Sequence, residues 1–111
     1  MSKYRSKKII IDGITFDSKR ESDRYVELKL LERCGKIKDL ELQHKFVLQP
    51  SFKKNGKTIR AITYIADFTY FDLERMRIVV EDVKGYKTEV YRLKKKMFEF
   101  VFPELTIIEV K

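Results

Sequence analysis

Two apolar segments of the sequence each contain an acidic residue where the core of a β-strand is expected. Asp67 interrupts the apolar and aromatic residues 63–70. Asp82 follows the apolar residues 78–80 and Glu81, and it lies two positions before Lys84. Side chains alternate between the two faces of a strand, so Asp82 and Lys84 share a face. A carboxylate is rarely placed among core residues without a partner charge or a metal ion. The pattern therefore indicates a chemical site, and the alternative is an ion pair at the edge of a sheet.

The two aspartates are expected to lie on neighbouring strands. They are 15 positions apart, which is enough for a turn and part of each strand. Two close carboxylates repel each other unless one takes up a proton or a divalent cation neutralises both. Because Mg²⁺ prefers hard oxygen ligands, we expect Asp67 and Asp82 to converge on Mg²⁺, for which Mn²⁺ would substitute.

Glu21 is the third candidate carboxylate. It lies four residues before Tyr25 and seven before Leu28, which places it on the inward face of a helix expected over residues 19–34. Residues 18–21, however, read Ser-Lys-Arg-Glu, a capping-box pattern in which the glutamate bonds the first amides of its own helix. The sequence leaves a helix cap and a functional carboxylate equally open.

Turn residues and side-chain periodicity predict the elements that position these groups. Asp12 and Gly13 favour a tight hairpin turn, Gly35 ends the first helix, and Pro103 ends the second because it has no amide hydrogen. The predicted order is a hairpin over 8–11 and 14–16, a helix over 19–34, strands over 44–52, 58–71 and 77–84, a helix over 88–102, and a strand over 105–110. This order predicts a single α/β domain over residues 1–111. Its central mixed sheet, an antiparallel meander plus the C-terminal strand, is flanked by two helices.

The composition indicates an anionic partner. Lys and Arg number 25 against 17 Asp and Glu, so the net charge is +8, while 43% of the residues are hydrophobic, which supports a folded core. Residues 1–6 are expected to form a mobile basic segment. On the second helix, Arg92 and its basic neighbours are expected to lie opposite an apolar stripe that includes Val90 and Leu93. The residues expected to contact the phosphate backbone of DNA are Lys3, Arg5, Lys7, Lys8, Lys87, Arg92, Lys94, Lys95 and Lys96.

Several classes of protein are disfavoured by what the sequence contains. No apolar run approaches the roughly 20 residues of a membrane span, and no apolar signal region follows the basic start. A single cysteine, Cys34, forms no internal disulfide, which favours a reducing cytoplasm. The four glycines build no phosphate-binding loop, so we expect no nucleotide cofactor.

The order of these motifs resembles that of the PD-(D/E)XK nuclease superfamily. The likeness is strongest to small phage endonuclease I type Holliday-junction resolvases, and it extends to a phage-encoded protein family with the same motif blocks. The blocks are residues 16–21, 64–68 and 81–85, so the resemblance covers most of the chain. Ala66 stands where the superfamily has Pro, and Asp82 stands where Glu is frequent. Glu81, next to Asp82, could be the acidic residue of the motif instead, because a β-bulge would redirect its side chain. Asp82 is preferred because it shares a face of the strand with Lys84.

The resemblance implies a restriction-endonuclease-like core and a Mg²⁺-dependent DNA endonuclease, acting on branched DNA during phage recombination or packaging. In this interpretation Asp67, Asp82 and the Val83 carbonyl hold Mg²⁺. Glu21 binds a second ion or its water, and Lys84 orients the attacking water. A homodimer is expected because a junction needs paired nicks, and a phage protein would act in the cytoplasm of its bacterial host.

Three other functions remain open from the sequence. The first is a non-catalytic basic DNA-binding module, in which the acidic residues form structural ion pairs. The second is a nuclease for linear duplex DNA or RNA, which the same residues would serve. The third is an interaction protein whose charge binds an acidic partner.

Overall fold

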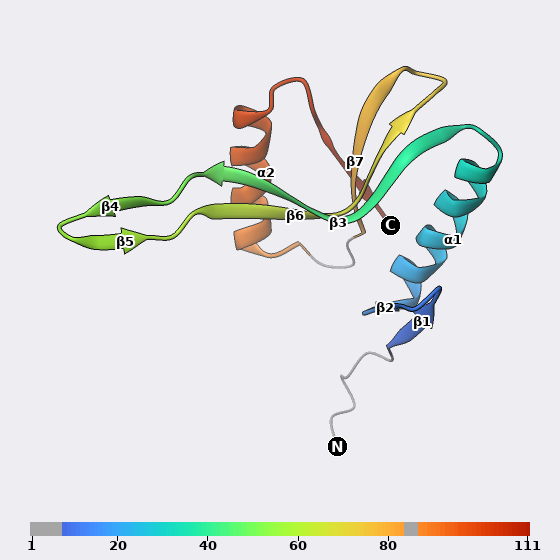
Figure 1. The fold of residues 1–111 in the computed structure, drawn as a ribbon, viewed down its shortest axis with the longest axis horizontal. Helices are drawn as coiled ribbons and strands as arrows, with labels where there is room; N and C mark the ends of the chain where they lie inside the picture. Colours follow the sequence, from blue (N-terminus) through green and yellow to red (C-terminus); the bar gives the residue numbers. More distant parts are fainter. Residues whose placement is uncertain (1–7, 84–86) are drawn as a thin grey trace.

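The computed structural model describes residues 8–83 and 87–111 (Figure 1). Within them, the main strands are β3 (Ile37–Gln49), β6 (Ile62–Asp72), β7 (Arg77–Val83) and β8 (Ile107–Val110), and the helices are α1 (Lys19–Arg33) and α2 (Glu89–Val101). The four strands form one sheet in the order β3-β6-β7-β8. The first three are antiparallel neighbours, and β8 runs parallel to β7. The predicted α/β fold with a mixed sheet and two helices is therefore confirmed.

The segment before the sheet follows its local sequence signals. A small hairpin consists of β1 (Ile9–Ile11) and β2 (Ile14–Phe16), and both turn residues, Asp12 and Gly13, have the positive φ angles of a tight hairpin turn. Ser18 caps α1, since its hydroxyl accepts a hydrogen bond from the Glu21 amide at 3.1 Å. Gly35, with φ +74°, follows the end of α1 and lets the chain turn into β3.

Two hydrophobic cores lie on opposite faces of the sheet. One packs α1 against β6 and β7 and includes Leu28 and Val79, while the other packs α2 against the same strands and includes Val80 and Phe98. Val79 and Val80 are adjacent in β7, so their side chains point to opposite faces. Residues 79–82 of β7 are thus enclosed between two layers, which explains how both of its acidic residues come to be buried.

The two antiparallel strands β6 and β7 part at a fork. Their pairing ends where Phe68 faces Glu81, and beyond this point, from Ala66 to Ile62, β6 is paired with β3 alone. Phe68 belongs to the α1 core but Ala66 to the α2 core, although alternate residues of a strand normally share a face. Two features account for this change of face. A two-stranded ribbon twists more strongly than a wider sheet. In β3, Gln43 lies between the partners of Ala66 and Phe68 and has a positive φ angle of 56°. Asp67 therefore stands where the ribbon turns its face from one helix to the other.

The strands differ in extent from the prediction. β3 begins at Ile37 rather than at residue 44, and it contains positive φ angles at Asp39 and Gln43, which interrupt the alternation on which the prediction relied. The strands predicted over 44–52 and 58–71 are also divided, because Pro50 has no N–H to donate to a ladder.

Beyond this break lies a separate two-stranded ribbon, which we call the β4–β5 arm (residues 50–61). It contains β4 (Phe52–Lys54) and β5 (Lys57–Ile59), joined by a turn at Asn55 and Gly56 with φ angles of 52° and 77°. Figure 1 shows that the arm projects away from the helices and the rest of the sheet.

The predicted apolar face of α2 is wrong. Val90 and Leu93 are 63% and 59% exposed, whereas Tyr91 and Phe98 are 5% and 0% exposed and form the buried face. Tyr91 and Phe98 are seven residues apart and so lie on one side of the helix. The Phe98 ring packs edge to face against Phe46 at 5.0 Å, and large aromatic side chains bury more apolar area than Val or Leu.

Neither of the helices in the described ranges is long and apolar enough to cross a membrane.

Two phenylalanines of α2 provide a matched test of this packing. Phe98→Ala should lower the free energy of unfolding by about 3–5 kcal/mol, because it leaves a cavity in the α2 core. Phe100→Ala should change it by less than about 0.5 kcal/mol, because Phe100 is 87% exposed. Urea unfolding followed by circular dichroism measures both, and equal losses would contradict the arrangement of α2.

Candidate functional site

Asp67 connects the two strands at the fork. Its Oδ2 accepts a hydrogen bond from the backbone amide of Val83 at 2.8 Å, and its Oδ1 accepts one from Gln43 Nε2 at 3.3 Å. Val83 is the residue after Asp82, so the Asp67 carboxylate is held beside the end of β7. The structure therefore brings Asp67 close to the segment that carries Asp82, as the spacing predicted.

Asp82 is buried at the same end of β7. It is 2% exposed, and its Oδ2 accepts a hydrogen bond from the Tyr64 hydroxyl at 2.5 Å. Burial raises the pKa of Tyr64 far above its usual value, and the hydrogen bond to Asp82 and the negative charges of Asp82 and Asp67 raise it further. The Tyr64 hydroxyl thus keeps its proton and donates it in the hydrogen bond that orients Asp82. The negative charge of Asp67 also acts on this tyrosine.

The pockets around the fork separate the three carboxylates. Asp67 and Glu21 line one pocket of about 330 Å³. Asp82 lines another, of about 260 Å³, together with Tyr64 and Lys94. Glu21 is thus brought to the pocket of Asp67 but not to that of Asp82. Its amide takes part in the helix cap, and its half-buried side chain lies at the Asp67 pocket, so both predicted roles of this residue remain open.

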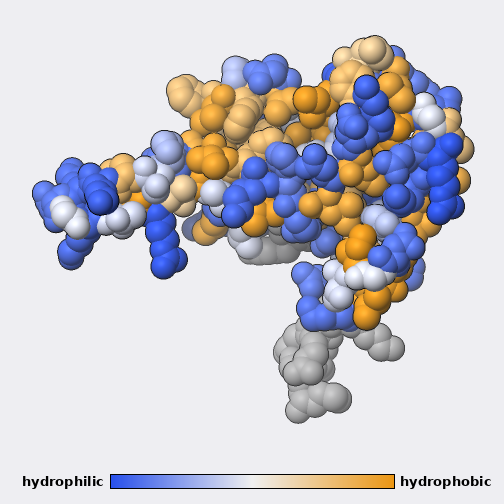
Figure 2. Space-filling model, viewed as in Figure 1, coloured by the Kyte–Doolittle hydropathy of each residue, from blue (hydrophilic) through white to orange (hydrophobic). Residues whose placement is uncertain are grey.

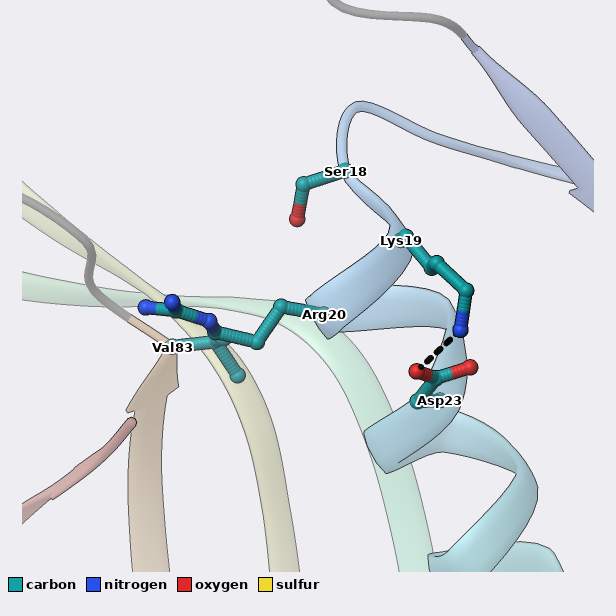
Figure 3. A pocket seen from close by; sticks show the side chains of 5 residues that line it. All are labelled: Ser18, Lys19, Arg20, Asp23 and Val83. Carbon is teal, nitrogen blue, oxygen red and sulfur yellow. Dashed lines mark hydrogen bonds and ion pairs between the residues drawn. The ribbon is translucent and has the colours of Figure 1, made fainter.

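A third and larger pocket, of about 520 Å³, lies between the start of α1 and the end of β7. In Figure 3 the Arg20 side chain extends from α1 toward β7 and its guanidinium lies beside Val83. Lys19 points the other way and forms an ion pair with Asp23 at 2.9 Å. Arg20 therefore adds a positive charge at the end of β7, beside Val83.

Glu81 has a different environment from its neighbour Asp82. It is 2% exposed, and its carboxylate accepts two hydrogen bonds from the Arg24 guanidinium, at 2.8 and 2.6 Å, and one from the Tyr70 hydroxyl at 2.5 Å. The hydrogen bonds to Glu81 raise the pKa of Arg24 further above its already high value. A bidentate pair of this kind joins α1 to β7. Glu81 thus has a structural role on the α1 face, whereas Asp82 lies on the α2 face.

The described residues contain no group of three His, Cys, Asp or Glu side chains that could hold a metal ion. The donor chemistry nevertheless fits Mg²⁺. This ion is usually bound through only one or two carboxylates, and water and substrate phosphate complete its coordination. Asp67 and Asp82 supply two carboxylates at the end of β7, one bonded to the Val83 amide and the other being the residue before Val83.

The predicted basic residues differ in their surroundings. Lys8 pairs with Asp17, Lys87 with Glu109 and Lys95 with Glu99, at 2.8, 2.8 and 3.2 Å. Lys94 lines the pocket of Asp82, while Arg92 and Lys96 are exposed on α2. Four of the predicted site residues, Lys3, Arg5, Lys7 and Lys84, lie outside the described residues.

Sequence reasoning missed the residues that orient the carboxylates. Tyr64 holds Asp82, Gln43 holds Asp67, and Arg24 holds Glu81, and the partners in each pair are 18 to 57 positions apart. The only local signal was the polar Gln43, in a segment expected to precede the strand. Arg20 was missed because it was considered only as part of the capping pattern.

The buried pair between Arg24 and Glu81 can be tested separately from Asp82. Glu81→Gln should lower the free energy of unfolding by about 3–5 kcal/mol, because it leaves the half-buried Arg24 without its main counter-charge. Glu27→Gln removes the exposed partner of Arg24, which lies at 3.5 Å, and should cost less than about 0.5 kcal/mol. Chemical denaturation measures both, and a neutral Glu81→Gln would contradict the structural role of Glu81.

Comparisons with known proteins give the family of the chain. No curated protein and no solved structure matches it. A family described as "Protein of unknown function (DUF1064)" matches residues 1–111, the whole of the sequence. The chain is therefore a member of the DUF1064 family.

Proposed function

We propose that this protein is a metal-dependent endonuclease that hydrolyses phosphodiester bonds in DNA. The observation that carries the proposal is the position of two strand carboxylates at the fork. Asp67 is bonded to the amide of Val83, Asp82 is the preceding residue, and the charges of both act on Tyr64. Paired acidic side chains beside a strand end, with basic side chains around them, suit the binding of a cation and of a phosphate.

Asp67, Asp82 and the Val83 carbonyl would hold Mg²⁺ or Mn²⁺, and Glu21 would bind a second ion or its water. The ion, when bound, would neutralise phosphate charge and lower the pKa of a bound water. This chemistry needs no histidine base. It accords with His44, which bonds Glu41 at 2.6 Å and does not line the pockets of the two aspartates.

The residues of the chain itself would position the reacting groups. The amide of Val83 and the side chain of Gln43 fix one carboxylate, and the hydroxyl of Tyr64 fixes the other. Lys84, outside the described residues, would orient the attacking water. Arg20, which lies beside Val83, and Lys94, which lines the pocket of Asp82, would contact the phosphate.

The charge of the protein supports a nucleic acid as substrate. The net charge is +8, and the exposed Arg92 and Lys96 extend the basic surface along α2. Preference for branched DNA, action on phage DNA and a bacterial cytoplasmic location follow from the resemblance to junction resolvases alone. Resolution of a four-way junction requires two nicks, so we expect the active form to be a homodimer.

A non-catalytic DNA-binding module is the second candidate. It is favoured by the fact that the described residues contain no group of three potential metal ligands. Under this alternative Asp67 and Asp82 would serve the fold, by satisfying the Val83 amide and the Tyr64 hydroxyl. The two functions differ in whether the bound DNA is cut.

Cleavage of labelled DNA distinguishes them. The substrates are a four-way junction, a linear duplex, a single strand and an RNA duplex, each incubated with Mg²⁺, Mn²⁺ or a chelator. We expect metal-dependent cutting that falls about 100-fold or more in Lys84→Ala and in Asp82→Asn, because each removes part of the charge stabilisation of the transition state. Glu104→Gln, at an exposed carboxylate, should cut normally.

Each result assigns a function. Binding without cutting by folded wild-type protein, with every metal, would replace the endonuclease with the DNA-binding module. Preferential cutting of linear duplex or RNA would keep the chemistry but reject the branched substrate.

A further inference from the structure

The β4–β5 arm carries a concentration of positive charge that the proposed site does not use. Residues 50–61 contain four basic residues and no acidic residue. All six residues of β4 and β5 are exposed. None of the ion pairs formed among residues 8–83 and 87–111 involves a cation of the arm. The four cations are Lys53, Lys54, Lys57 and Arg60.

The arrangement of these cations destabilises the arm when no anion is bound to it. Lys54 and Lys57 face each other directly across the ribbon, beside the Asn55–Gly56 turn. Like charges directly opposite on paired strands repel each other. Figure 2 shows that the projecting end of the arm is hydrophilic. A polyanion bound at this end would relieve the repulsion.

We propose that the β4–β5 arm enters the major groove of duplex DNA, with its lysines on the flanking phosphates. The major groove of B-form DNA, about 12 Å wide and 8.5 Å deep, admits a two-stranded ribbon, whose strands lie about 4.8 Å apart. The major groove of A-form RNA is too narrow for side chains to read. The Phe52–Ile59 pair, 43% and 40% exposed, adds apolar surface at the base of the arm. This inference rests on the proposed function in taking DNA as the substrate.

The arm has the reach to contact DNA at a distance from the proposed site. Asn55 at the tip and Asp67 at the fork are 12 positions apart along the chain. At the rise of a β-strand, this is a span of at most about 40 Å. One turn of B-form DNA is about 34–36 Å long. The arm would therefore hold the groove up to about one turn away from the cleaved phosphate.

Binding of a 30-base-pair duplex, measured by fluorescence anisotropy with chelator present, tests the arm without cleavage. The test variant carries K53Q, K54Q and K57Q. The control carries K29Q, R33Q and K36Q, in the last turns of α1 and just after its end. Figure 1 shows α1 on the other side of the molecule from the arm. Each variant changes the net charge from +8 to +5, since three lysines or arginines are removed.

The arm variant should bind about ten- to 500-fold more weakly at 0.1 M salt, and the slope of log affinity against log salt should fall by about 2 to 3. The control should lose less than about threefold, because the proposal puts no DNA at the end of α1 and salt screens charges more than about 10 Å away. Equal losses in the two variants, unchanged binding by the arm variant, or no binding by wild-type protein would overturn the proposal.

The choice of groove is tested by chemical protection. Wild-type protein should protect guanine N7, which lies in the major groove, from methylation by dimethyl sulfate, and the arm variant should not. On an RNA duplex of the same sequence, the two proteins should bind within about threefold of each other. Guanine protection that persists in the arm variant would reject insertion into the major groove. A loss of RNA binding by the arm variant as large as its loss of DNA binding would also reject it.

These results are independent of the proposed chemistry. Binding that depends on the arm, without cleavage under any metal, would reject the endonuclease and keep the arm. Metal-dependent cleavage by a protein whose binding does not depend on the arm would reject the arm and keep the endonuclease.

Discussion

The hydrogen bond from the Val83 amide to Asp67 is the contact on which the candidate site depends. Where β6 leaves β7, Val83 has no β6 partner in the sheet, although β8 still pairs with it on the other side, and a buried amide without an acceptor is costly. The Asp67 carboxylate accepts a hydrogen bond from this amide at 2.8 Å. This hydrogen bond satisfies the amide that the fork exposes, and it also fixes the position of the carboxylate. The same fork turns the face of the β3–β6 ribbon toward α2, which brings Tyr64 to Asp82.

The adjacent acidic residues of β7 illustrate how one strand serves both structure and chemistry. The strand is enclosed by two cores, so Glu81 and Asp82, on opposite faces, are both buried. Glu81 is neutralised by Arg24, which ties α1 to the sheet. Asp82 instead accepts a hydrogen bond from a neutral donor, the Tyr64 hydroxyl, on the α2 face. Because Glu81 is committed to the ion pair with Arg24, we propose Asp82 rather than Glu81 as the metal ligand.

Local signals in the sequence predicted most of the fold, whereas contacts between residues far apart in the sequence were not predicted. The first helix was expected over 19–34 and is observed over Lys19–Arg33, because capping by Ser18 and the turn at Gly35 are local properties. The buried face of α2 depends on which side chains contact the sheet. Periodicity therefore predicted a buried Val90, whereas the structure buries Tyr91. For the same reason, the pairing of Arg24 with Glu81 has no local signature.

The location of a bound divalent ion decides whether Asp67 and Asp82 form one metal site. Crystals grown with Mn²⁺ allow the ion to be placed by its anomalous scattering. We expect a peak within coordination distance of both Asp67 and Asp82, with the Tyr64 hydroxyl still hydrogen-bonded to Asp82, and loss of this peak in Asp67→Asn. Mn²⁺ found only at exposed carboxylates, with both aspartates bound solely to protein donors, would contradict it.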